Sequence, residues 1–507
     1  MITQALMVRL PVAFAFILGL LLLPYLYRRN YQPISAELAD SLLDCDYERS
    51  AFPIPANRNV RRYSRGVIRP RFDAKPDDDL FEFERPFLES FGLPHGDAFT
   101  PESNNACKKS NVATVTLESD PPVELTAPIL IGVATTVDRI ENTFDSLLSQ
   151  LQGTDASMIA LVPEAPDLPS KQQSMRERGL DITLYPTNLP FLESYFTLTE
   201  TFSYHIKNHR PHTKWIIWTD DDTYMPSLRS LGRRLKGLNH EQDHFYGAWS
   251  EKTHHLENLG RFPYGGGGII VSLPVLEALH DNYEYCMGSD VVPTNGTIGG
   301  DCHVWACLEK VKPDLELTIW SELRQFDVHG SPAGIYEDGR PIYSFHHWTN
   351  DSWAPTPVVE MAAVKAVAGE SSVRHRYVFD RKVEATNDSY DSSPEETQRE
   401  FFVLTNGYSI VRYRIHPGVD DIDFAAREAT WWEAVGMPEF DDYVQQLGPL
   451  RREVVPGIDK KRWYLQDAKL VDGNIHQLYI DMWRANEEIA KNRQRVEDWI
   501  EIIWLGR

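Results

Sequence analysis

Short apolar runs alternate with amphipathic stretches from Pro128 onward, and this alternation limits the possible folds more than any other feature of the chain. The runs at 129–134 and 215–219 are continuous and uncharged, as expected of strands buried on both faces of a parallel sheet. Two further strands are expected at 158–162 and 180–185. Helices are expected to begin at Asp138 and to cover 191–207, 226–238, 274–285 and 302–310. The alternation predicts an α/β domain with a mostly parallel sheet flanked by helices.

The chain of 507 residues is expected to divide into five parts. These are an N-terminal tail at 1–9, a transmembrane anchor at 10–27, a stem or linker at 28–125, the α/β domain at 126–360 and a smaller β-rich accessory region at 361–507. The stem is rich in Pro, Arg and Asp and has few periodic apolar stretches, which is typical of a linker with some local structure.

The expected anchor is an uninterrupted uncharged stretch of 18 residues, 10–27, which just reaches the length of a membrane-spanning helix. A cleaved signal peptide is the alternative, but its apolar core would be shorter and would end in small residues. Arg28 and Arg29 follow the run and would place the bulk of the chain in the cytoplasm. Three N-x-S/T sequons, at Asn295, Asn350 and Asn387, favour the opposite orientation.

The accessory region contains expected strands at 401–404, 408–414 and 462–465. A long helix is expected at its end, because apolar positions from Leu478 to Ile503 alternate spacings of four and three. A coiled coil and a helix packed on its own domain both fit this spacing. Ala485 and Asn492 weaken a coiled-coil seam and favour the second interpretation.

Charge and cysteine content narrow the possible functions. The chain carries 51 basic and 74 acidic residues, a formal charge of −23, which argues against binding to a nucleic-acid backbone. A nucleotide site remains possible, because a metal ion can supply positive charge locally. The five cysteines include no C-x-x-C pair, so a zinc or thioredoxin-like site has little support. Their odd number leaves at least one thiol unpaired in a monomer.

Three adjacent carboxylates, Asp220, Asp221 and Asp222, follow the strand expected at 215–219. Such carboxylates repel one another unless a cation lies among them. Their oxygen atoms suit Mg²⁺ or Mn²⁺, and ligands in α/β sheets bind beyond the carboxyl ends of the strands. An acidic turn in front of the next helix is the simpler alternative.

Further candidate residues follow along the chain. Four glycines, 265–268, precede an apolar strand and would allow the backbone to approach a ligand closely. Asp301 follows a loop with three glycines and begins a probable helix, where an N-cap is the simpler interpretation. His346 and His347 end a short apolar strand, and either is a candidate metal ligand.

These motifs, in this order, resemble the fringe-like branch of glycosyltransferase family 31. They are an Asp triplet after a Trp-containing strand, then F-P-Y-G-G-G-G-I-I-V-S, G-D-C and F-H-H, within residues 128–350. The length and the extra C-terminal region are similar to those of fungal members. The resemblance implies a GT-A-type fold, a UDP-sugar donor with Mn²⁺ (or Mg²⁺), transfer with inversion, and a Golgi-type anchor with the catalytic domain in the lumen.

The resemblance also implies roles for individual residues. Asp301 would be the catalytic base, and Asp220, Asp222 and His346 would hold the metal. The donor would be contacted by Thr135, Thr136, Asp220, Asp221, Gly266 and Gly267. The chain departs from the family pattern at Gly300, where a second acidic residue is usual, and at His347, which offers a competing ligand. The implied partners are the nucleotide-sugar donor, a glycan or glycoprotein acceptor and the membrane, with no nucleic acid.

Two other functions compete with this one. An inactive, lectin-like relative could stack sugars on tryptophans such as Trp431 and Trp432, although the intact Asp triplet, Asp301 and His346 argue against lost activity. A metal-dependent phosphatase or nuclease would usually need carboxylates and histidines from separate strands to hold two metals. No second acidic cluster follows a strand between residues 128 and 350.

Overall fold

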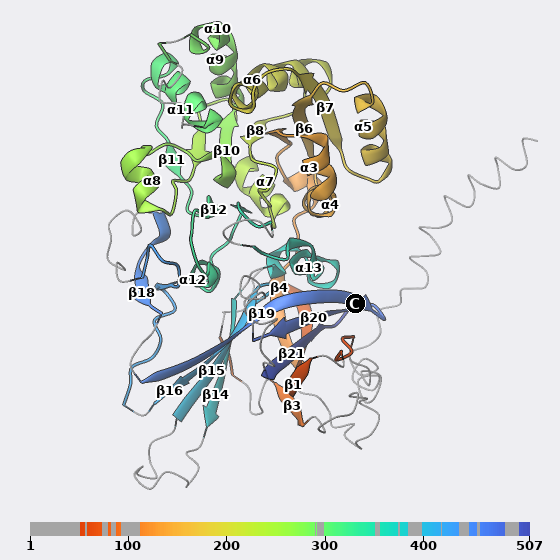
Figure 1. The fold of residues 1–507 in the computed structure, drawn as a ribbon, viewed down its shortest axis with the longest axis vertical. Helices are drawn as coiled ribbons and strands as arrows, with labels where there is room; N and C mark the ends of the chain where they lie inside the picture. The colour runs from red at the N-terminus through yellow and green to blue at the C-terminus, as the bar shows by residue number, and fades with distance from the viewer. Residues whose placement is uncertain are drawn as a thin grey trace, which may run out of the picture. The chain divides into compact units, whose positions relative to one another are not determined.

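In the computed structural model, the described residues lie within 51–99 and 111–506 (Figure 1). The described ranges are 51–55, 58–73, 80–82, 88–92, 112–288, 290–291, 299–349, 355–373, 376–383, 398–416, 418–435, 446–453, 457–481 and 496–506. The expected anchor, the three sequons, Cys45 and Cys107 lie outside them. Within these ranges, no helix combines the length and the apolar character needed to cross a membrane.

A seven-stranded sheet forms the α/β domain, in the order β11-β9-β10-β8-β5-β6-β7. Its strands are β5 (Ile129–Ala134), β6 (Ala156–Pro163), β7 (Ile182–Thr187), β8 (Trp215–Trp218), β9 (Phe245–Gly247), β10 (Ile269–Ser272) and β11 (Thr318–Ile319). Neighbouring strands from β8 to β7 are parallel, whereas β10 is antiparallel to both β8 and β9. The predicted mostly parallel sheet is confirmed.

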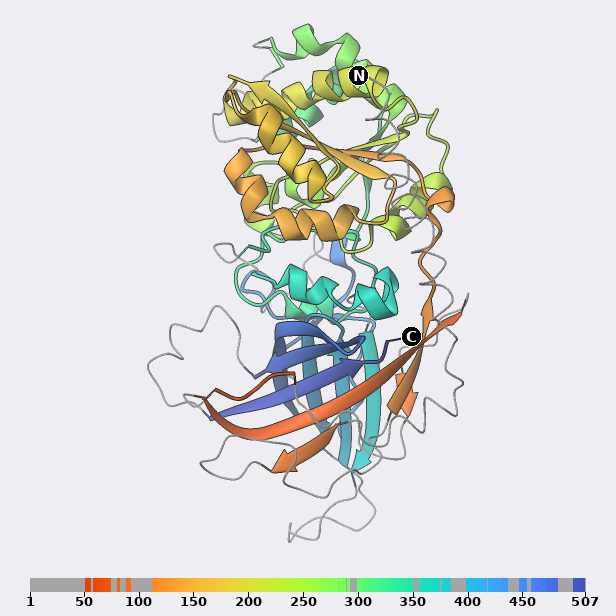
Figure 2. The same cartoon turned by 90° about the vertical axis from the view of Figure 1, so that its right-hand side faces the viewer.

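Helices cover both faces of this sheet, as Figure 2 shows. Ile129, Ile131 and Val133 pack in one core with α3, α4, α5 and α7, and Leu130 and Ala134 pack in another with α6, α9 and α11. Successive strand residues point to opposite faces, so a strand apolar at every position must be covered twice. The helices are α3 (Val137–Asn142), α4 (Phe144–Leu151), α5 (Leu168–Glu177), α6 (Phe191–Asn208), α7 (Leu228–Lys236), α9 (Leu273–Asp281) and α11 (Gly300–Val311).

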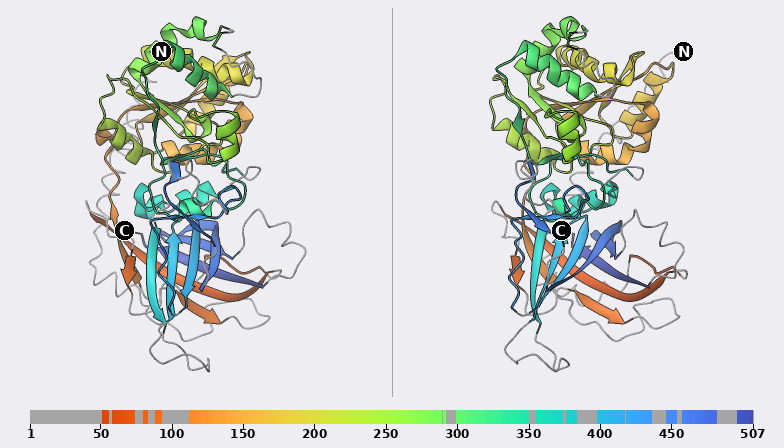
Figure 3. Two further views of the ribbon diagram at one scale, coloured as in Figure 1. Left: turned by 90° about the vertical axis from the view of Figure 1, so that its left-hand side faces the viewer. Right: turned by 60° about the vertical axis from the view of Figure 1, so that its left-hand side comes forward.

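A second sheet of ten strands forms most of the rest of the unit (Figure 3). Its order is β2-β14-β15-β16-β19-β20-β21-β1-β3, with β4 also paired to β1. The strands are β1 (Asn59–Asp73), β2 (Leu80–Glu82), β3 (Glu89–Gly92), β4 (Val112–Glu118), β14 (Arg376–Val383), β15 (Gln398–Thr405), β16 (Ser409–Ile415), β19 (Ile458–Val471), β20 (Asn474–Ile480) and β21 (Val496–Trp504). The three strands predicted in this region are confirmed within β15, β16 and β19.

The predicted C-terminal long helix is wrong where the structure describes it. Leu478 lies in strand β20, and Trp499 and Ile503 lie in β21. Every residue of β21 after Val496 is buried, and its isoleucines and tryptophans favour a strand over a helix. The spacing of apolar residues by four and three therefore does not indicate a helix here, because β21 is apolar on both faces.

Part of the expected stem at 28–125 also forms strands in the structure. Strand β1 lies inside the ten-stranded sheet, parallel to β21, with Tyr63 opposite Trp499. Strand β4 pairs with β1 on its other side. Residues from before the α/β domain therefore complete the accessory sheet. Local composition could not reveal this pairing, because the two partners are more than four hundred residues apart in the chain.

The largest apolar core packs the ten-stranded sheet against loops and short elements of the α/β domain. Tyr224, in the loop after β8, and Phe345, in a two-residue strand, pack in one cluster with Tyr377, Trp463 and Trp504 of the ten-stranded sheet. Shorter elements complete the description: α8 (Thr253–Asn258), α10 (Tyr283–Cys286), α12 (Ala333–Tyr336), α13 (Val358–Ala362), α14 (Lys365–Ala368), β12 (Leu323–Arg324), β13 (Ser344–Phe345), β17 (Arg427–Ala429) and β18 (Leu450–Arg452). A disulfide between Cys286 and Cys307 links α10 to α11, and Cys302 is a free, buried thiol.

Candidate active site

The carboxyl ends of β5 and β8 bring the first candidate residues together. Gly132 pairs with Trp218 in parallel register, and the Thr219 amide donates to the Gly132 carbonyl at 3.0 Å. Thr135 and Thr136 follow β5, and the Asp triplet follows β8. Because parallel neighbours end at the same edge of a sheet, these two loops meet.

Asp221 is neutralised by the protein itself. The Thr135 hydroxyl donates to its carboxylate, and the Arg139 guanidinium forms two more bonds, one from Nε at 2.5 Å. Thr136 is the N-cap of α3 and accepts from the Arg139 amide at 3.3 Å. The helix therefore begins at Val137, one residue before the predicted start. These contacts give Asp221 a fixed cation and separate it from its two neighbours.

Asp222 and Asp220 instead face His346. The imidazole Nε2 lies 2.8 Å from Asp222 Oδ1 and 3.3 Å from Asp220 Oδ2. Backbone bonds of 2.9 and 3.0 Å between Tyr224 and Phe345 hold the two loops in this position. Burial opposes the charged forms, but the hydrogen bond between the partners prevails. It lowers the pKa of Asp222 to about 2 and raises the pKa of His346 to about 9.

His347 faces the same carboxylate because its backbone is turned. Consecutive residues of an extended strand point to opposite sides, but His347 has a φ of 55° and its ring lies 3.7 Å from that of His346. Its Nδ1 is 3.8 Å from Asp222 Oδ2, and its Nε2 is 3.3 Å from Asp327 Oδ1. A non-glycine residue in this region is strained, and such strain is concentrated at functional sites.

The residues at this edge have the chemistry of a metal site. Asp222, His346 and His347 each offer one ligand atom, and these atoms all lie within 4.8 Å of one another. Asp220 adds a further carboxylate, whose pKa rises to about 7 because it is withdrawn from water and lies among other acidic groups. The described residues around Asp220 and Asp222 supply histidines but no lysine or arginine bonded to them. Carboxylate oxygens and imidazole nitrogens at this spacing fit a divalent cation.

The glycines predicted to contact the donor pack against the metal-site residues. A Cβ at Gly266 would lie 2.0 Å from Nδ1 of His346, so only glycine fits there. The Thr223 hydroxyl donates to the Gly266 carbonyl at 2.8 Å, and the Gly267 amide donates to the Gln325 side chain at 2.8 Å. These contacts hold Nδ1 of His346 against the glycine loop and leave Nε2 for the carboxylates.

Asp301 lies on the other side of the glycine loop. It is in the first turn of α11, where Gly299 is the N-cap, so the simpler N-cap interpretation does not hold. Its Oδ2 accepts from the Gly265 amide at 2.8 Å and its Oδ1 from the Cys302 amide at 2.8 Å. Burial raises the pKa of Asp301 against the effect of these bonds. No cation is bonded to this carboxylate among the residues that the structure describes.

Tyr195 explains the departure from the family pattern at Gly300. A Cβ at Gly300 would lie 2.4 Å from the Tyr195 Cβ, so an acidic residue cannot replace this glycine unless Tyr195 moves. The Tyr195 hydroxyl lies beside Gly265 and is buried, with no hydrogen-bond partner in the described part of the chain. It thus faces the loop between Asp301 and the Asp triplet. No motif in the sequence marks this residue, which lies in the second turn of α6.

Sequence reasoning also missed Arg139 and Asp327. Asp327 accepts from Ser250, from His255 Nδ1 at 2.9 Å and from His347, contacts that outweigh burial and hold its pKa well below its usual range. It follows Phe326, which has a φ of 56°. Arg139 could have been suspected from its place in the turn after Thr136, but nothing in the local sequence marks Asp327.

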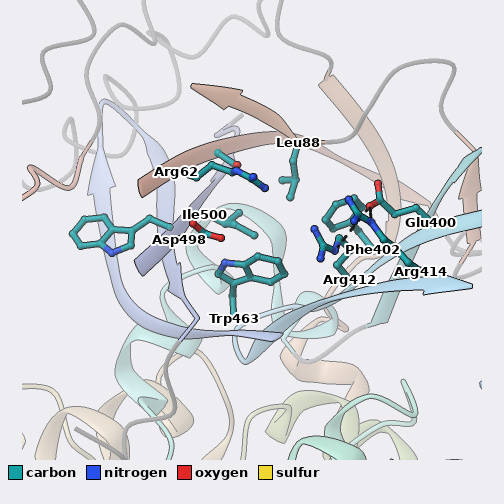
Figure 4. A pocket seen from close by; sticks show the side chains of 11 residues that line it. Arg62, Leu88, Glu400, Phe402, Arg412, Arg414, Trp463, Asp498 and Ile500 are labelled. Atoms are coloured by element: carbon teal, nitrogen blue, oxygen red, sulfur yellow. Dashed lines mark hydrogen bonds and ion pairs between the residues drawn. The ribbon is translucent and has the colours of Figure 1, made fainter. Parts of the chain in front are cut away.

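A hollow of about 100 Å³ on the ten-stranded sheet is of a different kind (Figure 4). Three arginines and two carboxylates line it; Arg414 Nε donates to Glu400 at 2.8 Å, and Asp498 accepts from Arg61 at 2.9 Å. The cavity is lined by Arg62, Ser64, Leu88, Glu400, Phe402, Arg412, Arg414, Trp463, Asp498, Trp499 and Ile500. It therefore lacks the surplus of carboxylates found at the first site.

Two family models match the chain. Residues 193–323 match the Fringe-like family, and residues 260–409 match the family described as a protein of unknown function, DUF604. The matched residues include the Asp triplet and Asp301 in the first, and the glycine loop, Asp301 and both histidines in the second. The resemblance to fringe-like glycosyltransferases is confirmed. No curated protein matches the chain.

Several solved structures of glycosyltransferases are similar at low identity. GlyE of Streptococcus pneumoniae TIGR4 is 10% identical, with 49% of this chain and 62% of that chain covered and a TM-score of 0.31. A galactosyltransferase, LgtC, in complex with donor and acceptor sugar analogues is 12% identical, with coverage of 45% and 91% and a TM-score of 0.31. A glycosyltransferase involved in glycosylation of the major capsid of PBCV-1 is 12% identical, with coverage of 44% and 94% and a TM-score of 0.27.

Proposed function

We propose that this protein is a metal-dependent, inverting glycosyltransferase that moves a sugar from a UDP-sugar to a glycan or glycoprotein acceptor. The observation that carries the proposal is the arrangement at the carboxyl edge of the seven-stranded sheet. Asp222, Asp220 and two histidines form a cluster of carboxylate and imidazole groups, and Asp301 lies across the glycine loop from it. A cation site and a separate carboxylate are the two parts that such a reaction needs.

The metal would be held by Asp222, Asp220 and Nε2 of His346, with His347 as a competing ligand. Mn²⁺ or Mg²⁺, when bound, would stabilise the charge that develops on the diphosphate leaving group. Thr135 and Thr136 would lie beside the uridine at the end of β5. Gly266 and Gly267 would keep the loop close to the donor while fixing the ring of His346.

Asp301 would accept the proton of the acceptor hydroxyl as the new bond to the anomeric carbon forms. Its carboxylate is oriented by two backbone amides, from Gly265 and Cys302, so it needs little reorganisation during the reaction. Burial brings its pKa closer to the pH at which a general base is effective. Inversion requires one such carboxylate and no covalent intermediate.

The proposed location is the Golgi membrane, with residues 10–27 as the anchor and the catalytic domain in the lumen. The Cys286–Cys307 disulfide supports a compartment of the secretory pathway, because disulfides persist in oxidising surroundings. The three sequons support the same orientation. Glycosidase treatment of the native protein should then lower its apparent mass.

Calorimetric titration with UDP, with and without Mn²⁺, tests the proposal. Wild type should bind UDP only with the metal. Asp222→Asn should lose this metal-dependent UDP binding without unfolding. Asp467→Asn, on the ten-stranded sheet, is the matched control and should bind as wild type. A screen of UDP-sugars for UDP release then tests activity. Metal-independent UDP binding, or UDP binding without release from any UDP-sugar, would contradict the proposed enzyme and favour a sugar-binding relative.

A further inference from the structure

The accessory region contributes a rigid tryptophan to the edge of the α/β domain. Gly330 and Trp431 form an antiparallel bridge, and the Trp432 amide donates to the His329 carbonyl at 2.8 Å. The Thr430 hydroxyl donates to the Ser331 carbonyl at 2.6 Å. Trp431 is fully buried and anchors this segment. The backbone that carries Trp432 is therefore held from both sides.

Trp432 itself is 73% exposed, the most exposed large apolar side chain among the described residues. Its ring lies nearly parallel to that of His329, at 24° with ring centres 6.0 Å apart. The ammonium group of Lys252 lies 3.1 Å from His329 Nε2. An indole face is thus displayed beside a ring nitrogen and a cation. Exposed tryptophans held in a polar surrounding are enriched at binding surfaces.

A short chain of contacts connects this surface with the candidate active site. The Lys252 amide donates to the Ser250 hydroxyl at 3.1 Å, and Ser250 donates to Asp327. Asp327 contacts His347 at 3.3 Å, and His347 contacts Asp222 at 3.8 Å. The loops that carry Lys252 and His329 are therefore the same loops that position the second histidine.

The accessory region also contacts the first of these loops directly. Gln446 accepts from the Trp249 amide at 2.6 Å and donates to the Trp249 carbonyl at 2.7 Å. Gln446 therefore contacts the loop at 249–252, and Trp432 contacts the segment at His329. The loop at 249–252 follows β9, which β10 and β8 separate from β5 in the sheet. The carboxyl end of β5 is the proposed place of the uridine. A ligand at Trp432 would approach from a part of the site that the nucleotide does not use.

We propose that Trp432, with His329 and Lys252, is an acceptor subsite that binds a sugar ring of the glycan next to the ring that receives the transferred sugar. A pyranose presents a face of C–H groups that packs on an indole, while its hydroxyls bond to polar groups at the edge. The observed arrangement of one indole face and adjacent nitrogen donors fits this chemistry. The inference rests on the proposed function and names where its acceptor binds.

Binding to a panel of defined oligosaccharides containing galactose, mannose or N-acetylglucosamine tests the subsite, with Mn²⁺ and UDP present. Trp432→Ala should weaken binding of the oligosaccharides that wild type binds by about tenfold or more, because the indole face that the sugar would cover is lost. Trp432→Phe should retain most of the affinity. Tyr285→Ala removes another exposed aromatic side chain, 54% exposed on α10, and should change nothing. UDP binding with Mn²⁺ should be equal in all four proteins.

The outcomes separate the subsite from the proposed function. UDP-sugar hydrolysis by wild type, together with equal oligosaccharide affinity of Trp432→Ala and Tyr285→Ala, would overturn the subsite and leave the enzyme standing. Oligosaccharide binding that depends on Trp432, with no UDP release from any donor, would support the subsite and contradict the enzyme. A change in self-association of Trp432→Ala, with unchanged glycan affinity, would assign Trp432 to a protein contact and overturn the proposal. Failure of wild type to bind any oligosaccharide would overturn it as well.

Discussion

Two groups of carboxylates in this molecule are compensated in opposite ways. In the first group, Glu428 of strand β17 lies 2.7 Å from Arg451 Nη1 and 2.9 Å from Arg462 Nη2, and it also bonds Lys460. At the edge of the seven-stranded sheet, Asp220 and Asp222 share two histidines. Two arginines and a lysine are bonded to the first group, whereas no arginine or lysine is bonded to the second among the described residues.

This difference in pairing separates a structural charge network from a candidate binding site. A buried charge is tolerated when it is paired and hydrogen-bonded, so the Glu428 network needs nothing from outside the protein. Carboxylates that have no lysine or arginine partner repel one another, and this repulsion favours binding of a cation between them. Four predictions test this contrast, beginning with the largest expected effect.

Asp301→Asn should reduce sugar transfer by about 10²–10⁴-fold, the range for loss of a general base, because an amide cannot accept the proton. Folding and metal-dependent UDP binding should survive, since the Asn oxygen can keep one of the two backbone hydrogen bonds, from Gly265 or from Cys302. Steady-state rates with a suitable acceptor provide the measurement, with the exposed Glu309→Gln on the same helix as control. Turnover within a few-fold of wild type would assign Asp301 a structural role only.

Glu428→Gln should lower the free energy of unfolding by about 3–5 kcal/mol, because three cations would lose their shared buried partner. Denaturant unfolding measures the change. Glu453→Gln is the control: Glu453 borders the same network but is 41% exposed, so its loss should cost less than about 1 kcal/mol. Equal effects of the two substitutions would show that burial of the network does not matter.

Glu501→Gln tests the same principle through pH. Burial opposes ionisation of Glu501, but the hydrogen bond from His476 and the charge of Arg65 prevail and lower its pKa to about 2. A lowered carboxyl pKa stabilises the fold above the ordinary value of 4.5, and this stabilisation disappears as pH falls toward 2. The variant should be less stable by about 3 kcal/mol at pH 7. A difference from wild type that stays constant down to pH 2.5 would contradict this account.

Asp220→Asn should have the smallest effect and the opposite sign. The raised pKa of Asp220 means that its ionised form is disfavoured in the folded protein, a cost that grows as pH rises above 3.8 and is complete above about 7. Without metal at pH 8, the variant should be more stable by about 1 kcal/mol. With Mn²⁺ the order should reverse, because the variant loses a ligand. Unfolding with and without Mn²⁺ checks both signs, and lower stability of the variant in both conditions would refute the contrast.

The sequence alone determined the α/β domain and the order of its motifs. Continuous apolar runs such as 129–134 and 215–219 are expected of strands covered on both faces, so the carboxyl ends that carry Thr135 and Asp220 could be placed on one edge. It also located Asp301 and the His346–His347 pair, because a glycine loop and a strand end are marked by local composition. These features depend on residues near one another in the chain.

Tertiary structure alone decided which partners these residues have. Arg139 neutralises Asp221, and the positive φ of His347 turns its ring toward Asp222, but neither contact follows from spacing. The same holds for β1 and β21, which pair across almost the whole chain and replace an expected stem and an expected helix. Local sequence fixes which residues are buried and where strands end. It does not fix which distant segment supplies the neighbouring strand or the opposite charge, because that choice is made by packing of the whole fold.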